Sequence, residues 1–198
     1  MMHPDTELRF INKEKGYGVV ATKFIPAGTI TWVLDRLDKV YRPSQYKALE
    51  PIYRNILDIY TYRNNEGNFI LCWDHARFMN HSFNSNCLST AYDYEIAVRD
   101  IEKGEELTDD YGYLNVTEPF TPVDEGYERK TVYPDDLLFF YKLWDEQLKA
   151  VFNKIELVDQ PLKAVIKKST WKITQSVING KLPLASTLFN FFNPNSAS

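Results

Sequence analysis

Two short polar segments interrupt mostly apolar stretches of the chain, and they constrain its fold more than any other feature. The first is Arg77-Phe78-Met79-Asn80-His81-Ser82, and the second follows about thirty residues later as Glu105-Glu106-Leu107-Thr108-Asp109-Asp110-Tyr111-Gly112-Tyr113. A buried polar pair such as Asn80 and His81 requires hydrogen-bond partners. The fold must therefore supply such partners to residues that lie among apolar neighbours.

The length of 198 residues favours one main domain with a single core, with room for a helical appendage. Hydrophobic residues make up 44% of the chain and charged residues 25%, which is ordinary for a globular protein. The formal net charge of -4 gives no reason to expect nucleic-acid binding, because phosphate backbones attract clustered Lys and Arg. A basic protein segment would suit this acidic balance better as a partner.

The two cysteines, Cys72 and Cys87, form no Cys-x-x-Cys motif and have no His/Cys cluster beside them. The pattern therefore predicts neither a disulfide framework nor a metal site. Residues 1–10 lack the apolar run of a Sec-type signal peptide, and no stretch is long enough to span a bilayer. We therefore expect a cytoplasmic or nuclear protein with no membrane partner, and a specialised secretion route stays open.

Short strands are predicted over much of the first 113 residues. Turn residues and runs of β-prone side chains place them near Leu8–Ile11, Gly18–Lys23, Thr29–Val33, Phe69–Trp73 and Glu95–Val98. The first two should form a hairpin around Asn12–Tyr17, where glycines can adopt positive φ. Apolar residues at three- and four-residue intervals predict one or two short helices within residues 43–60, interrupted at Pro51.

The character of the chain changes after Tyr113. A Thr-, Pro- and acid-rich stretch, Val116–Tyr133, reads as a loop, and Pro134-Asp135-Asp136 as the start of a helix. A helical apolar stripe then runs from Leu137 to Phe152, and a weaker one from Leu162 to Ile173. We interpret the first stripe as a core face, with a partner-binding surface as the alternative.

Four pieces of the sequence, in this order, resemble the signature of SET-domain protein-lysine methyltransferases. They are Gly16–Val19, Tyr60–Tyr62, Arg77–Asn86 and Glu106–Tyr113, and the resemblance covers roughly residues 7–113. It implies a mainly β fold with α additions, built from several small sheets around a knot-like core. The implied division is a SET domain over 1–115, with a helical insert at about 43–60, and a post-SET-like loop with a C-terminal helical extension over 116–198.

The resemblance also implies transfer of a methyl group from S-adenosylmethionine to a lysine side-chain amine in a protein or peptide, such as a histone tail. Such a displacement at carbon requires close alignment of donor and acceptor rather than a protein nucleophile. The acceptor lysine, with an ordinary pKa near 10.4, must also lose its proton. A narrow apolar channel favours this by desolvation, and tyrosine rings suit its walls.

Site residues follow from the resemblance, position by position. Tyr111 matches the catalytic tyrosine, and Tyr113, Tyr62 and Asp109 are expected to line the substrate channel. The residues expected to bind the cofactor are Gly16, Tyr17, Gly18, Tyr60, Arg77, Phe78, Asn80, His81 and Tyr111. Three aromatic residues of the following loop, Phe120, Tyr127 and Tyr133, are the candidates for covering the adenine, with no choice among them.

Some positions depart from the family pattern. Phe83 and Ser85 replace the usual Cys and Pro, and Asp109 stands where many relatives have Phe or Tyr, a position that influences how many methyl groups a lysine receives. Asp109 and Ser85 together support an alternative, a catalytically silent SET-like module that binds a protein partner or cofactor. A different acceptor side chain, or a ribosomal or host protein as the target, also stays open.

Asp109 and Asp110 could instead form a paired acid/base or metal site. Neighbours on a strand point to opposite faces, which disfavours that interpretation.

Overall fold

The computed structural model describes residues 1–194, which contain three small β-sheets. The strands are β1 (Thr6–Asn12), β2 (Gly16–Ala21), β3 (Ile30–Val33), β4 (Lys39–Tyr41), β5 (Thr61–Arg63), β6 (Phe69–Leu71), β7 (Asn80–His81), β8 (Cys87–Ser89), β9 (Tyr94–Ala97) and β10 (Glu106–Asp109). Their orders are β1-β2-β10-β7, β3-β9-β8 and β4-β6-β5. The expected fold class, mainly β with helical additions, is confirmed.

The first sheet brings the two polar segments together. The predicted hairpin is present as β1 and β2, and Gly16 adopts a φ of +73° at its turn. β10 pairs with β2 on one side and runs parallel to β7 on the other, with Thr108 opposite Asn80 and Asp109 opposite His81. Residues of the two segments, far apart in the sequence, thus lie side by side in one sheet.

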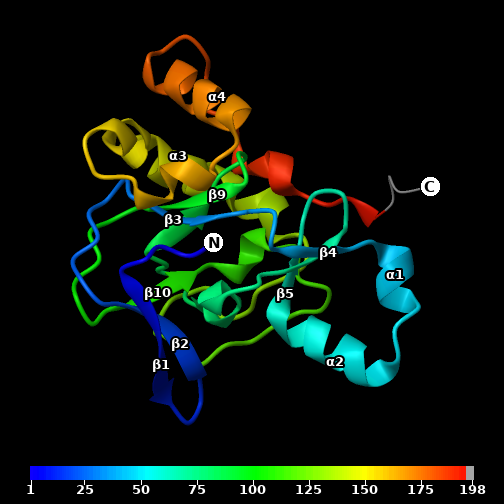
Figure 1. Cartoon of the computed structure of the whole chain (residues 1–198). Helices are drawn as coiled ribbons and strands as arrows, with labels where there is room; N and C mark the ends of the chain where they lie inside the picture. The colour runs from blue at the N-terminus through cyan, green and yellow to red at the C-terminus, as the bar shows by residue number, and fades with distance from the viewer. Residues whose placement is uncertain (195–198) are drawn as a thin grey trace.

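The predicted helical insert lies between β4 and β5, on one side of the molecule (Figure 1). It consists of α1 (Pro43–Lys47) and α2 (Pro51–Tyr60). Pro51 begins α2, because the first turn of a helix needs no N–H from that residue. The chain passes from α2 directly into β5, and Tyr60, Thr61 and Tyr62 at this junction line one cavity.

The C-terminal part adds helices that cover the second sheet at the top of Figure 1. They are α3 (Asp136–Val151) and α4 (Lys168–Ile178), with short 3-10 turns at η3 (Phe152–Glu156), η4 (Pro161–Val165) and η5 (Thr187–Asn190). The α3 stripe is a core face as predicted, since Leu137, Trp144 and Leu148 pack with Leu88 of β8 and Ile96 of β9 in one buried cluster.

The weaker stripe is not one helix. Leu162 and Val165 belong to η4, whereas Ile173 belongs to α4. Ile166 and Lys167 between them have extended backbone angles, with ψ of 134° at both, which end one turn before the next helix begins.

The proposed division at residue 115 stays a prediction, and residues 195–198 of its second part lie outside the described residues. Side chains on both sides of that boundary share the core cluster of α3, β8 and β9. A second cluster, beneath the first sheet, contains Val19, Met79 and Leu107. No helix within residues 1–194 combines the length and apolar character needed to cross a bilayer.

Candidate active site

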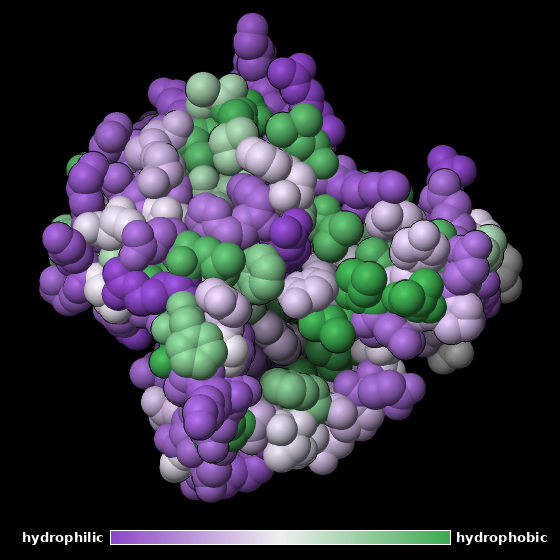
Figure 2. Space-filling view, turned by 60° about the horizontal axis from the view of Figure 1, so that its bottom comes forward, coloured by the Kyte–Doolittle hydropathy of each residue, from purple (hydrophilic) through white to green (hydrophobic). Residues whose placement is uncertain are grey.

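A cavity of about 560 Å³ opens between the insert, the end of β10 and the loop that follows residue 113. Hydrophobic side chains gather around a hollow in the middle of this face of the molecule (Figure 2). The predicted site residues in its lining are Tyr60, Tyr62, Arg77, Asp109 and Tyr111. The predicted residues outside the lining are Gly16, Tyr17, Gly18, Phe78, Asn80, His81 and Tyr113.

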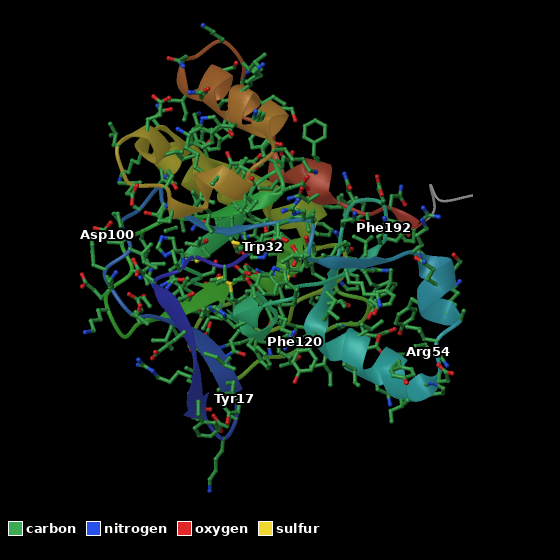
Figure 3. The ribbon with its side chains drawn as sticks, in the orientation of Figure 1. Tyr17, Trp32, Arg54, Asp100, Phe120 and Phe192 are labelled. Carbon is green, nitrogen blue, oxygen red and sulfur yellow. The ribbon has the colours of Figure 1, made fainter. Side chains whose placement is uncertain are left out.

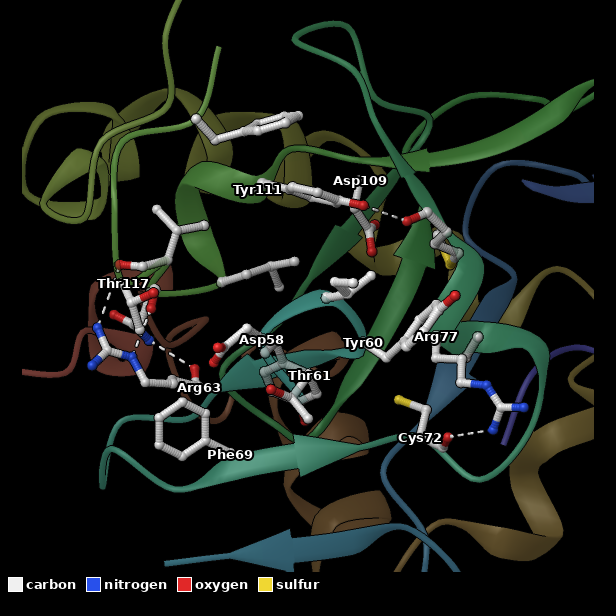
Figure 4. A pocket seen from close by; sticks show the side chains of 18 of the residues that line it. Asp58, Tyr60, Thr61, Arg63, Phe69, Cys72, Arg77, Asp109, Tyr111 and Thr117 are labelled. Atoms are coloured by element: carbon white, nitrogen blue, oxygen red, sulfur yellow. Dashed lines mark hydrogen bonds between the residues drawn. The ribbon is translucent and has the colours of Figure 1, made fainter. Parts of the chain in front are cut away.

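Tyr111 lies on one wall of the cavity and is fixed at both ends. β10 ends at Asp109, and Tyr111 opens the 3-10 turn η2 (Tyr111–Tyr113). Its backbone N–H donates to His81 Nδ1 at 3.1 Å, and its hydroxyl donates to the Met79 carbonyl at 2.7 Å (Figure 4). Burial raises the pKa of the Tyr111 phenol, which therefore stays protonated and keeps this bond at neutral pH.

Asp109 lies beside Tyr111, and its carboxyl points into the same cavity (Figure 4). Only 5% of this residue is exposed. Glu95, which is contributed by β9 of the second sheet, is 6% exposed and lines the same cavity. Two carboxyl groups from different sheets therefore meet at this wall.

Tyr113 is turned away from the main cavity, although it was expected in the substrate channel. Its hydroxyl donates to Asp109 Oδ1 at 2.8 Å and also lies 3.2 Å from the Cys87 carbonyl. Its ring packs edge-on against Trp144 of α3 with centroids 5.4 Å apart, and the residue is 2% exposed. The structure therefore places Tyr113 behind Asp109, where it supports the wall.

The opposite side of the cavity is aromatic. Tyr62 packs edge-on against Trp32 with centroids 5.9 Å apart, and Tyr60 packs edge-on against Phe78 at 5.3 Å. Arg77 lies over the Phe78 ring at 5.2 Å and donates to the Trp73 carbonyl at 3.3 Å. Trp32 lies at the centre of the molecule and Phe120 below it (Figure 3).

Asn80 joins the glycine hairpin to β10, on the other side of the first sheet. Its amide donates to the Tyr17 carbonyl at 3.1 Å and to Glu106 Oε1 at 2.7 Å. Gly18 is needed here, because a Cβ would come within 2.8 Å of Asn80 Nδ2 and would clash with Glu106 Oε1. Four predicted cofactor residues, Gly16 to Gly18 and Asn80, therefore form one cluster, while Tyr17 itself is 54% exposed.

His81 is buried and neutral. Burial lowers its pKa to about 3, and the positive charges of Arg129 and Lys15 act in the same direction. Since Nδ1 accepts a hydrogen bond from Tyr111, the single ring proton lies on Nε2. Nε2 is buried and has no hydrogen-bond partner within residues 1–194.

Aromatic rings surround this histidine. Their centroids lie 4.4 Å (Phe83), 5.3 Å (Tyr111) and 6.0 Å (Phe120) from that of His81. Of the three candidates for covering an adenine, the structure thus brings Phe120 to the site. Phe120 also lines the cavity, whereas Tyr127 and Tyr133 do not.

Asp109 and Asp110 point in different directions, as strand alternation predicts. Asp110 accepts from the Gly112 backbone N–H at 2.9 Å, which caps η2, and pairs with Arg129 of the following loop. Glu125 of the same loop accepts from the Ser82 hydroxyl at 3.0 Å. Within residues 1–194, no group of three or more His, Cys, Asp or Glu side chains is arranged to hold a metal ion.

Sequence reasoning missed Glu95, Trp32 and Glu106 as parts of the site. Glu95 carried a usable signal, because it is a carboxylate within the apolar strand Tyr94–Ala97. Glu106 lies in the family-like segment Glu106–Tyr113 but was not assigned a role, and Trp32 gave no signal, since it reads as an ordinary strand residue.

Comparison with known proteins gives a family match and matches to solved structures. Residues 16–112 match the family model described as SET domain. A Plasmodium falciparum protein, named as a candidate histone methyltransferase, is similar in structure with a TM-score of 0.41 and 18% sequence identity, over 56% of this chain and 95% of that chain. No curated protein sequence matches the chain significantly.

Proposed function

Because residues 16–112 form a SET domain and the chain thereby belongs to the SET-domain methyltransferase family, we propose that it methylates the side-chain amine of a lysine in a protein, with S-adenosylmethionine as donor. The observation that carries the proposal is the position of Tyr111. Its hydroxyl donates a hydrogen bond to the Met79 carbonyl on the wall of an aromatic cavity. Its backbone N–H donates to His81 of β7, the strand that pairs with β10.

The residues around β7 fit the proposed donor. Bound S-adenosylmethionine supplies a methyl group on a positively charged sulfur. The missing Cβ at Gly18 lets the Asn80 amide and the Glu106 carboxylate lie against the hairpin backbone, where they offer polar contacts to a bound donor. The Nε2–H of His81 is a buried donor that needs an acceptor, and the rings of Phe83 and Phe120 beside it suit an adenine.

The chain's own residues would act mainly by positioning. Tyr111 borders the cavity next to the strand that carries the donor cluster, so that an amine in the cavity could approach a methyl group held there. Trp32, Tyr60 and Tyr62 exclude water from the lysine stem and favour a neutral amine by desolvation. Phenol oxygens can also accept weak hydrogen bonds from a polarised methyl group.

A basic protein segment, such as a histone tail, is the proposed partner. The lining contains four acidic residues, Asp58, Glu95, Asp109 and Glu118. The two arginines there, Arg63 and Arg77, are occupied in part by backbone carbonyls of Asn115 and Trp73. The net charge of -4 favours the same kind of partner.

Transfer of a labelled methyl group from S-adenosylmethionine to mixed histones and cell lysate tests the proposal. We expect labelled proteins with the wild type, and about a 100-fold lower rate with Tyr111→Phe, because small displacements of aligned groups cost that much. Tyr141→Phe, on α3 and outside the cavity lining, is the matched control and should label normally.

Cofactor binding by calorimetry completes the experiment. Binding with no labelling of any pool by the wild type would contradict the enzyme and favour a silent binding module. Equal labelling by Tyr111→Phe and the wild type would contradict the role of Tyr111.

A further inference from the structure

Glu95 and Asp109 form a buried pair of carboxyl groups, here called the acid pair, in the wall that also carries Tyr111. They come from β9 and β10, strands of different sheets. Fixed strands on both sides hold the pair in place. An internal acid pair would ordinarily be avoided, because burying charge is costly unless it is paired.

The hydrogen bonds around the acid pair are incomplete. Glu95 Oε1 accepts from the Ser89 hydroxyl at 3.0 Å, and Asp109 Oδ1 accepts from the Tyr113 hydroxyl at 2.8 Å. Glu95 Oε2 is buried and has no partner within residues 1–194 while both groups are ionised. One proton resolves this, because a protonated Asp109 donates to Glu95.

The acid pair therefore holds one proton, and its remaining negative charge titrates close to neutral pH, because burial raises the pKa of Glu95 to about 7. Burial raises the pKa of both carboxyls, and their mutual repulsion raises that of Asp109 further. Neither carboxyl forms an ion pair with Lys or Arg within residues 1–194. The titratable groups that face the pair are Tyr62, Cys72, Cys87, Asp110, Tyr111, Tyr113 and the amino group of Met1.

We propose that the acid pair binds the ammonium group of the acceptor lysine and takes up its proton before methyl transfer. This rests on the proposed function. The negative charge of the acid pair is buried on the wall of a cavity bordered by Tyr111 and has no ion-paired cation within residues 1–194, so a positive group in the cavity would stabilise it.

The step balances. The ammonium gives one proton to Glu95, so that the pair becomes neutral and the amine gains a free electron pair. That electron pair forms the new N–C bond to the donor's methyl carbon, and the electrons of the broken C–S bond stay on sulfur. The product amine is again a cation, and the pair releases its extra proton to solvent when the cavity empties.

The pair could alternatively be structural only, serving to hold Tyr113. The two roles differ in how the rate depends on pH. If the pair takes up the proton, the rate must fall at low pH as the pair becomes fully protonated. A structural role would leave the pH dependence unchanged.

The test compares initial methylation rates on mixed histones from pH 5.5 to 9.5 for the wild type, Glu95→Gln and the double variant Glu95→Gln/Asp109→Asn. The double variant should lose about 10²-fold at pH 7.5. It should come within about tenfold of the wild type at pH 9.5, where a fraction of free lysine is already neutral. Glu95→Gln alone keeps one carboxyl and should move the acidic limb of the profile to lower pH.

Controls separate this inference from the function on which it rests. Glu102→Gln, an exposed acid near β10, should match the wild type, and the affinity of each variant for S-adenosylmethionine should change by less than about twofold. If the double variant fails to fold, the rate-against-pH profile of Glu95→Gln alone tests the inference. An acidic limb displaced to lower pH would support it, and an unchanged limb would overturn it. Identical pH profiles would overturn the inference, whereas no labelling by the wild type at any pH would overturn the proposed function.

Discussion

Arg129 is predicted to stabilise the protein strongly, because it bridges two buried acids. Its guanidinium donates to Asp110 through Nη1 and to Asp136 through Nη2. The side chains of these two acids are only 3% and 4% exposed. The guanidinium also lies over the rings of Phe83 at 4.7 Å and Phe140 at 4.5 Å.

The magnitude follows from the charges that remain. Arg129→Met would leave two buried carboxylates without a cation, and breaking one buried pair costs about 3–5 kcal/mol. Loss of the cation–π contacts adds about 1 kcal/mol or more. Burial already raises the pKa of Asp110 despite Arg129, so part of the cost would be relieved by protonation. We therefore expect a loss of about 3–5 kcal/mol at pH 7.5, decreasing as the pH is lowered.

Urea unfolding at pH 7.5 and pH 5 measures this difference. Arg129→Lys is the matched control; it keeps the charge but cannot bridge both acids in the same fork geometry, and should lose about half as much. In the Arg129→Met background, the changes Asp110→Asn and Asp136→Asn should restore stability by removing the unpaired charges. A loss below about 1 kcal/mol for Arg129→Met, or no rescue by the amides, would refute this reasoning.

Two further predictions concern the cluster behind Tyr111. Gly18→Ala would place a methyl group against Asn80 and Glu106, so cofactor affinity measured by calorimetry should fall. Gly104→Ala is the control: nothing lies within 4 Å of the added methyl group, but the φ of +90° at this position strains any residue other than glycine, so stability should fall and affinity should not. The pKa of His81 is lowered in the folded state, so stability is present above the unfolded value near 6.5 and is lost as pH falls toward 3. His81→Gln should remove this loss, about 1.4 kcal/mol per pH unit below 6.5, and equal slopes of unfolding free energy against pH for variant and wild type would contradict the assignment.

The sequence predicted the meeting of the two polar segments only through family resemblance. Nothing in the pattern of Asn80 and Tyr111 specifies that β7 runs parallel to β10, because pairing between distant strands depends on the whole chain. Local features could be predicted directly from the sequence. The turn at Gly16 and the start of α2 at Pro51 follow from backbone preferences of single residues, and both are present.

The direction of side chains around η2 could not be predicted in the same way. Alternation along β10 correctly separated Asp109 from Asp110. The alternation ends with the strand, and the 3-10 turn carries Tyr113 back toward α3. The backbone N–H of Gly112 donates to the Asp110 carboxylate and so caps this turn. Arg129, which lies in a later loop, pairs with the same carboxylate and orients it.

Asp109 illustrates why a departure from a family pattern has to be judged in three dimensions. Considered alone, Asp109 in place of Phe or Tyr would put a carboxylate without a partner in the buried wall of the cavity. No other residue of β10 offers it a hydrogen bond. The structure supplies Tyr113 as a donor and Glu95 as the acceptor for a shared proton. Glu95 Oε2 has no hydrogen-bond partner in the described chain, and a proton shared with Asp109 gives the two carboxyls a hydrogen bond to each other. Replacing either one by an apolar residue should therefore disturb the wall more than replacing both by amides.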